Sequence, residues 1–360
     1  MGARRTWRWW GLFAFAAVAL LSCGGGGPTL SGGRDTAAEL AADAGDPVQA
    51  ALDPPTTTTA PPPPPTTGPP TTSPPPPPPQ PLAPEAAPPA GGAGRSGLEP
   101  YGGLGTWLDV YDWSITYGNG PIASLDDIDR MAALGVQTLY IQASKWDSPT
   151  DVLEPDRLTA YIDRAHGDGM RVVAWYLPTL EDPALDLQRL LAIATLDVEG
   201  LAVDMESKKV ADVADRNARA VQLSDGLRAA LPGRVLALIP LPPVLLDEIN
   251  PNYWPDYPWA ALAPYYDLWM PMSYWTNRTS ESGFRDAYMY TASNIDRMRA
   301  YVGNPALPCH ALGGIGNGTS ASDVAGMVQA TVERGCIGGS VYDYRTTDDE
   351  TWSALQAFRA

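Results

Sequence analysis

The sequence has few of the residues that build metal sites and disulfide frameworks. Only three of its 360 residues are cysteine and two are histidine, His166 and His310. None of them lies at a spacing typical of a metal site. The sequence also lacks a serine nucleophile elbow and the paired-histidine helix of metalloproteases. These absences exclude the commonest zinc centres and serine hydrolases, and we expect no metal and no other cofactor.

Basic residues are also scarce. The chain has 24 Lys and Arg against 41 Asp and Glu, which gives a formal net charge of −17. Such an acidic protein is repelled by phosphate backbones and by anionic lipid headgroups. We therefore expect no nucleic-acid partner.

The N-terminus has the pattern of an export signal. Residues 1–10 contain three arginines, residues 11–21 are apolar, and Ser22 and Cys23 follow. An apolar run of this length is too short to span a bilayer. The end of the run resembles a lipobox, in which Cys23 is lipidated and becomes the new N-terminus. Residues 1–23 are thus expected to be a bacterial lipoprotein signal, which would anchor the protein to the outer face of the cell membrane.

Residues 24–100 form a low-complexity segment rich in proline, threonine and glycine. Pro61–Pro65 and Pro74–Pro79 are uninterrupted proline runs. Such a segment cannot bury a core and favours extended polyproline II structure. We expect a disordered linker that acts as a semi-rigid stalk.

Residues 101–360 alternate between strand and helix patterns and have the length of one barrel domain. Eight such units predict an α/β fold, a (βα)8 TIM barrel with parallel strands; a doubly wound open sheet is the alternative. The strands are expected at 107–113, 136–142, 170–177, 199–207, 235–239, 268–274, 307–312 and 336–342. The helices are expected at 125–134, 155–165, 183–195, 210–231, 284–301, 322–334 and 350–358.

Two cysteines belong to this domain. Cys309 and Cys336 lie near the starts of the last two expected strands, which are neighbours in a barrel. In an exported protein they form either a disulfide or two buried thiols, and the sequence leaves both possibilities open.

The fourth expected strand carries the main candidate for chemistry. In EGLAVDMES, residues 199–207, Asp204 and Glu206 alternate with apolar residues. Alternate side chains of a strand point to the same face, so the two carboxyl groups lie roughly 7 Å apart along it. Each raises the proton affinity of the other, which suits acid/base catalysis.

Aromatic and acidic side chains gather at the carboxyl ends of the expected strands, where barrels build their active sites. Aromatic rings stack on sugar rings, and carboxylates bind hydroxyl groups. A glycan is therefore the expected substrate. The candidate binding residues are Asp109, Asp112, Trp113, Gln142, Trp146, Trp175, Tyr176, Met272, Trp275, Tyr342, Asp343 and Tyr344.

Two further features near the end of the seventh expected strand are less specific. The glycine-rich run Gly313–Gly318 fits either a phosphate cradle or, more commonly, a mobile loop. His310 is interpreted as a satisfied polar residue and not as a catalytic base.

Three short motifs resemble glycoside hydrolase family 18, the chitinase-like barrels. EGLAVDMES is similar to the fourth-strand pattern D-G-x-D-x-D-x-E, and MPMSY at 270–274 is similar to the sixth-strand M-x-Y-D. Gly338–Val341 resembles the start of the eighth strand. The first strand, WLDVYDWS, is also reminiscent of the lysozyme-like family 25, in which an Asp opens the barrel.

The family 18 resemblance implies a retaining, substrate-assisted mechanism. Glu206 would be the general acid, Asp204 would orient the substrate N-acetyl group, and Tyr274 would donate a hydrogen bond to it. Three positions depart from the pattern, because Glu199, Ala202 and Trp275 each replace an aspartate of the family motifs.

The expected function is that of a surface-anchored, monomeric glycoside hydrolase acting on an N-acetylated amino-sugar polymer of the chitin or cell-wall type. The alternative is a carbohydrate-binding barrel that has lost activity. A structural spacer without sugar affinity is a third possibility.

Overall fold

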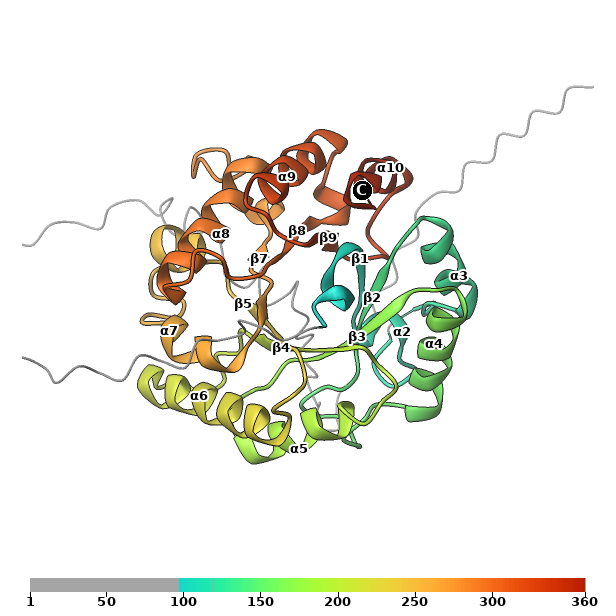
Figure 1. The fold of residues 1–360 in the computed structure, drawn as a ribbon, viewed down its shortest axis with the longest axis horizontal. Helices are drawn as coiled ribbons and strands as arrows, with labels where there is room; N and C mark the ends of the chain where they lie inside the picture. Colours follow the sequence, from blue (N-terminus) through green and yellow to red (C-terminus); the bar gives the residue numbers. More distant parts are fainter. Residues whose placement is uncertain (1–96, 119, 360) are drawn as a thin grey trace, which may run out of the picture. The chain divides into compact units, whose positions relative to one another are not determined.

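The structure is a computed structural model that describes residues 97–118 and 120–359. The expected lipoprotein signal, with Cys23, and nearly all of the expected linker lie outside the described residues. Within the described part, strands and helices alternate along the chain, and Figure 1 shows the helices arranged around the strands.

All strand pairs in the sheet are parallel, in the order β6-β5-β4-β3-β2-β1-β9-β8-β7. The first and last strands of the described residues thus lie side by side, since β1 pairs with both β2 and β9 (Figure 1). The strands are β1 (Gly103–Leu108), β2 (Thr138–Gln142), β3 (Arg171–Tyr176), β4 (Gly200–Met205), β5 (Leu236–Pro240), β6 (Leu268–Trp269), β7 (Met272–Ser273), β8 (His310–Ile315) and β9 (Gly338–Tyr342).

The sheet closes through the segment expected as the sixth strand. This segment is present as two short pieces, β6 and β7, separated by Met270 and by Pro271, which has no N–H to donate. β6 pairs with β5 and β7 pairs with β8. Between them the Trp269 amide donates to the Pro308 carbonyl, and the Met270 amide donates to the Leu238 carbonyl on the other side. The two ends of the sheet are therefore one stretch of chain, and the TIM-barrel prediction is confirmed.

Aromatic side chains fill the barrel interior. Trp107 stacks on Tyr140 with ring centroids 4.3 Å apart, and its indole N–H donates to the Ser340 hydroxyl at 2.8 Å. Large rings require small neighbours in the same layer. Gly105 meets this requirement, since a Cβ there would lie 2.6 Å from the Tyr140 ring and 3.3 Å from His310. The interior below the mouth is thus a packed core.

His310 lies in this core and is fully buried. Its Nδ1 is 2.8 Å from the Tyr101 carbonyl oxygen, which can only accept, and its Nε2 is 2.8 Å from the Ser340 hydroxyl. Burial lowers its pKa to about 4. A neutral imidazole with satisfied nitrogens agrees with the interpretation made from sequence.

The outer helices begin where their sequences offer an N-cap. Ser124 and Ser320 each form a capping box with an aspartate three residues later, and Asp182, Asp212, Asp286 and Asp348 cap four other helices. The main helices are α3 (Leu125–Ala133), α4 (Pro155–Gly167), α5 (Pro183–Ile193), α6 (Val213–Ala230), α7 (Trp259–Leu262), α8 (Ala287–Val302), α9 (Ala321–Glu333) and α10 (Asp349–Leu355).

The first expected strand, Trp107–Trp113, is wrong in its second half. β1 ends at Leu108, and the chain turns into the short helix α2 (Val110–Trp113). The cause is Asp109, whose carboxylate accepts the amides of Tyr111 and Asp112 in a capping box. The strand-to-helix switch places Asp109 at the mouth of the barrel.

The glycine-rich run also differs from the expected loop. Gly313 and Gly314 belong to β8, and only Gly316–Gly318 form a helical turn. The reason is Trp275, whose ring lies where a Cβ on either strand glycine would be, at 2.2 Å and 2.7 Å. The ring of Trp275 thus takes the space beside the strand that a glycine cradle would need for a ligand.

Cys309 and Cys336 form a disulfide that joins the chain just before β8 and β9. Of the two possibilities left open by the sequence, the structure has the bridge.

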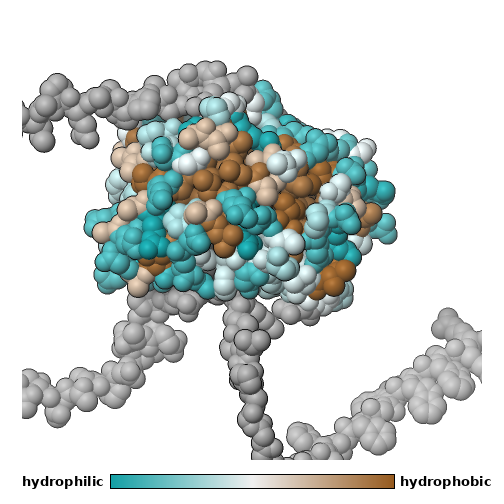
Figure 2. All heavy atoms as spheres, turned by 90° about the horizontal axis from the view of Figure 1, so that it is seen from below, coloured by the Kyte–Doolittle hydropathy of each residue, from teal (hydrophilic) through white to brown (hydrophobic). Residues whose placement is uncertain are grey.

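No helix of the described residues combines the length and the apolar character needed to span a bilayer. Figure 2 shows one face of the described residues, on which apolar residues gather across the middle and hydrophilic residues surround them. Isolated exposed apolar side chains such as Ile115 and Val332 are common on globular proteins.

Candidate active site at the mouth of the barrel

Asp204 and Glu206 are closed off from solvent at the carboxyl end of β4. Asp204 is 2 % and Glu206 1 % exposed. Both Glu206 carboxyl oxygens and Oδ1 of Asp204 lack a hydrogen-bond partner among the described residues. An unpaired buried polar group costs about 1–3 kcal/mol, so folded proteins rarely keep several together without a use for them.

Burial favours the uncharged form of both acids. Desolvation raises the pKa of Asp204 well above its ordinary value. Desolvation, and then repulsion by Asp204, raises the pKa of Glu206 in the same way. Burial therefore favours the protonated form of both carboxyl groups, which can donate a proton.

A second carboxyl group cluster lies at the ends of the first and last strands. One oxygen each of Asp109, Asp112 and Asp343 lies within 4.8 Å of the others. Desolvation is the main reason that the pKa of Asp109 rises to about 6 and the pKa of Asp112 to about 9. The charge of Asp343 raises the pKa of both residues, and the charge of Asp109 further raises the pKa of Asp112. Burial raises the pKa of Asp343 as well. Three acids this close share protons instead of all being ionised.

Two tyrosines lie between the acid pair and this cluster. The Tyr342 hydroxyl donates to Oδ2 of Asp109 at 2.7 Å, and its ring centroid is 6.0 Å from that of Tyr274. Burial raises the pKa of Tyr274, and the charges of Asp204, Glu206, Asp343 and Asp109 add to this shift. Tyr274 is therefore within electrostatic reach of both groups of acids, and they form one site.

Tyr257 is a site residue that sequence reasoning missed. It comes from the proline-rich segment between β5 and α7, is buried, and donates from its hydroxyl to the Met205 carbonyl at 3.1 Å. Asp204 and Glu206 contribute to the rise of its pKa, although burial is the main cause. This contact depends on how a long loop folds back over β4, and no local pattern in the sequence indicates it.

The same loop is held to the chain that follows Glu206. The Lys208 amine lies 3.7 Å from the Tyr253 ring centroid. The Arg216 guanidinium lies 4.5 Å from the Trp254 ring, and the Trp254 indole donates to the Asn217 side chain at 2.7 Å. The β5–α7 loop thus contributes to closing the mouth over the acid pair.

The predicted binding aromatics divide into two groups. Trp175 and Met272 are buried, with the Trp175 ring 6.0 Å from Trp107 inside the barrel. Trp113 and Tyr176 instead contact the helix layer. The Trp113 indole donates to the Gln142 carbonyl and its ring packs against Tyr161 of α4, while the Tyr176 hydroxyl donates to Asp186 of α5.

The remaining predicted residues lie around the mouth. The Gln142 side-chain carbonyl accepts the Val110 amide at 3.1 Å, which joins β2 to α2. Trp146 is partly exposed and lies under the Lys145 and Lys209 amines, 4.6 Å and 3.6 Å from its centroid. Trp275 is fully buried against β8.

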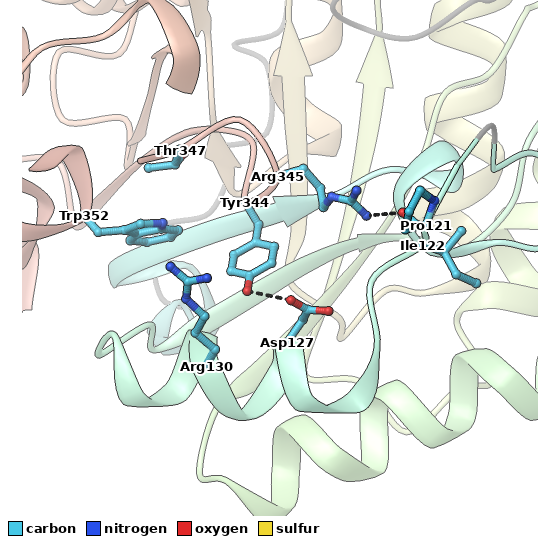
Figure 3. Close-up of a pocket in the computed structure, with 8 residues that line it drawn as sticks. All are labelled: Pro121, Ile122, Asp127, Arg130, Tyr344, Arg345, Thr347 and Trp352. Carbon is cyan, nitrogen blue, oxygen red and sulfur yellow. Dashed lines mark hydrogen bonds between the residues drawn. The ribbon is translucent and has the colours of Figure 1, made fainter. Parts of the chain in front are cut away.

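Tyr344 belongs to a separate cavity of about 330 Å³ beside the mouth (Figure 3). Its hydroxyl donates to Asp127 at 2.9 Å, and Arg345 donates to the Pro121 carbonyl at 2.7 Å. The cavity lies between α3 and the β9–α10 segment, and its lining residues are Pro121, Ile122, Asp127, Arg130, Tyr344, Arg345, Thr347 and Trp352.

The Asp109, Asp112 and Asp343 cluster has the donor type of a divalent-cation site. Its oxygens already accept protein hydrogen bonds, however. Asp109 accepts from two backbone amides and Tyr342, Asp112 from the Asp109 amide, and Asp343 from the Thr346 amide. We assign no metal to it.

Comparisons with known proteins extend the fold assignment. No model of a known protein family matches the sequence, and a search of curated proteins finds no match. Among solved structures, the spore cortex-lytic enzyme SleL of Bacillus cereus is similar with a TM-score of 0.52 and 11 % identity, over 72 % of this chain and 74 % of that one.

Two other solved structures have the same degree of similarity. A β-galactosidase from the psychrophilic Marinomonas ef1 has a TM-score of 0.52 and 11 % identity, over 71 % of this chain and 58 % of that one. A class V chitinase from Pseudomonas fluorescens has a TM-score of 0.50 and 12 % identity, over 72 % of this chain and all of that one. At these identities the likeness shows a shared barrel fold.

Proposed function

We propose that this protein is a glycoside hydrolase that cleaves an N-acetylated amino-sugar polymer of the chitin or cell-wall type. The observation that carries the proposal is the buried acid pair Asp204 and Glu206 at the carboxyl end of a barrel strand, with three of its oxygens unpaired among the described residues and both pKa values raised by burial. The similar structures include a cortex-lytic enzyme and a chitinase, which supports the same substrate class.

In the proposed reaction Glu206 is the general acid. Burial and the neighbouring Asp204 raise the pKa of its carboxyl group, which favours the protonated form that can protonate the glycosidic oxygen as the bond to the leaving sugar breaks. Asp204 orients the substrate N-acetyl group, whose oxygen attacks the anomeric carbon, and Tyr274 donates a hydrogen bond to that group. Water then attacks the anomeric carbon and breaks its bond to the N-acetyl oxygen, while the Glu206 carboxylate takes up the proton of the water, so that the acid is restored and the configuration is retained.

The closed mouth sets one requirement for this reaction. Because both Glu206 oxygens are shielded from solvent, the side chains over the acid pair must move before a sugar can reach it. Tyr257 and the loop that carries it are the part we expect to open, since long loops commonly act as active-site lids.

The test is hydrolysis of chitin-type oligomers and cell-wall glycan fragments by the full chain, measured as release of reducing ends. We expect Glu206→Gln to lower the rate by about 100-fold or more, because it removes the proton donor. Glu199→Gln is the matched control, at the opposite end of β4, where Glu199 accepts the Val172 amide. Equal rates for wild type and Glu206→Gln would refute the assignment of the acid.

A non-catalytic carbohydrate-binding barrel is the second candidate. The closed acid pair and the replacement of two family aspartates by Ala202 and Trp275 favour it. It predicts that the wild-type protein binds amino-sugar oligomers, as measured by calorimetry, and releases no reducing ends from any of them. Release of reducing ends by the wild-type protein would exclude it.

We further propose that a lipid on Cys23 anchors the protein at the outer face of the cell membrane, and that the proline-rich stalk holds the barrel away from it. The support is the sequence pattern of residues 1–100. We expect Cys23→Ala to move the protein from the membrane fraction to the soluble fraction of the producing cells, and unchanged partition would contradict the anchor.

A further inference from the structure

We infer that the cavity beside the mouth is a binding site for a carboxylate-bearing sugar residue of the glycan. This inference rests on the proposed function for the nature of the polymer. It concerns a second site, whose residues take no part in the proposed proton transfer.

The cavity adjoins the acid cluster of the mouth. Tyr344 and Arg345 directly follow Asp343, which belongs to that cluster. The Tyr344 amide also donates to the Trp107 carbonyl on β1, so this wall is fixed to the barrel. We therefore assign the cavity to another ring of a glycan that is bound at the mouth.

Two arginines supply the chemistry for an acidic ligand. In Figure 3 Arg130 and Arg345 enter the cavity from opposite walls. Arg345 donates one hydrogen bond, to Pro121, and its other N–H groups have no partner within residues 97–118 and 120–359. Guanidinium groups bind carboxylates through paired, charge-assisted hydrogen bonds, which suits a carboxylate better than a neutral hydroxyl.

Two acidic residues nearby compete with a ligand for the arginines. Asp127 accepts hydrogen bonds from Tyr344 and from Ser124. Burial raises the pKa of Asp127, but these hydrogen bonds and the charge of Arg345 outweigh it and lower that pKa. Asp349 is ion-paired with Arg130 at 2.8 Å, but its side chain is 86 % exposed. An exposed pair of this kind contributes little, so a ligand carboxylate can replace Asp349.

The size and lining of the cavity fit a single sugar ring. Its volume of about 330 Å³ is at the lower end of the range for small-molecule sites. Tyr344 and Thr347 contribute hydroxyl groups from the β9–α10 segment, Asp127 contributes a carboxylate from α3, and Ile122 adds an apolar surface. These groups give a sugar ring contacts that a bare anion does not use.

The test measures binding of three small probes to the full chain by calorimetry at low salt. N-acetylmuramic acid differs from N-acetylglucosamine only by the ether-linked lactyl group that bears its carboxylate, and acetate carries a carboxylate without the sugar. We expect N-acetylmuramic acid to bind about tenfold or more tightly than either of the others, since a charge-assisted hydrogen bond is worth about that factor. Equal binding of the two sugars, or equal binding of acetate, would overturn the inference.

Substitutions then locate the site. Arg130→Gln and Arg345→Gln are each expected to weaken binding of N-acetylmuramic acid about tenfold and to leave N-acetylglucosamine unchanged. Asp349→Asn removes the competing carboxylate and is expected to strengthen the binding of N-acetylmuramic acid a few-fold. Arg219→Gln is the matched control, since Arg219 is also ion-paired on a helix surface, with Asp215 at 2.9 Å. The inference fails if Arg219→Gln weakens binding as much as the two cavity variants.

The result can be separated from that of the proposed function. Binding is measured without turnover, so a preference for the acidic sugar that depends on Arg130 and Arg345 stands even if no glycan is hydrolysed. Hydrolysis that proceeds with no such preference would overturn the cavity assignment and leave the proposed function intact.

Discussion

Replacing Glu206 by glutamine tests the electrostatics of the acid pair through the stability of the fold. Glu206 is 1 % exposed, and burial followed by repulsion from Asp204 raises its pKa. The folded protein then holds a proton that the unfolded chain releases above about pH 4.5. The contribution of Glu206 to stability is therefore fully present below that pH and is lost as the pH rises through the folded-state pKa.

The magnitude follows from the linkage relation. One proton held only by the folded state changes the free energy of unfolding by about 1.4 kcal/mol per pH unit. At pH values between the ordinary glutamate pKa and the raised pKa of the folded state, the wild type should lose stability at about this rate through this group. Glu206→Gln keeps the shape of the side chain and does not titrate. The free energy of unfolding of this variant should therefore fall less with rising pH than that of the wild type, and the difference is the contribution of Glu206.

The assay is urea denaturation of the full chain at pH 5, 6, 7 and 8, with the free energy of unfolding taken from each curve. Glu199→Gln serves as control, because Glu199 is partly exposed and accepts a backbone hydrogen bond. The reasoning is refuted if wild type and Glu206→Gln lose stability in parallel between pH 5 and 7.

Three further variants probe the second acid cluster, the core and the disulfide. Tyr342→Phe removes the hydroxyl that donates to Asp109, so it should raise the pKa of Asp109 above about 6. The variant should be less stable than the wild type by about 1–3 kcal/mol above pH 7 and by less at pH 5, and thermal melts at both pH values check this. Gly105→Ala places a Cβ 2.6 Å from a core tyrosine ring and should cost about 1–3 kcal/mol, whereas an unchanged melting temperature would contradict the packing described. Replacing Cys309 and Cys336 by alanine opens a crosslink between residues 27 apart and should cost about 3–4 kcal/mol in urea denaturation; no loss would mean that the bridge does not form in the folded protein.

The sequence allowed the barrel and most of its elements to be predicted, because the determining signals are local. Seryl and aspartyl caps mark the starts of the helices, and apolar runs mark the buried strands. Alternation along β4 was enough to place Asp204 and Glu206 on one face. The sequence left open whether Cys309 and Cys336 form a disulfide, because their pairing depends on how the last two strands lie relative to each other.

What failed depends on contacts between distant segments. WLDVYDW has a strand-like composition, but Asp109 caps a helical turn and shortens the strand. Gly313 and Gly314 became strand residues because the Trp275 ring, from a separate segment, packs on them. Tyr257 reaches the acid pair from a loop with no regular pattern. The separation of Trp113 and Tyr176 from the mouth likewise follows from which face of each element meets a helix.

The claim on which this account depends is that burial inside the mouth of the barrel raises the pKa of Glu206 well above its ordinary value. The most direct measurement is the carboxyl ¹³C chemical shift of Glu206 in labelled protein, followed from pH 4 to pH 9 and assigned with the Glu206→Gln variant. We expect the carboxyl group to ionise well above the pH range of an ordinary glutamate. A carboxylate that titrates near pH 4.5, as in an exposed glutamate, would contradict the account.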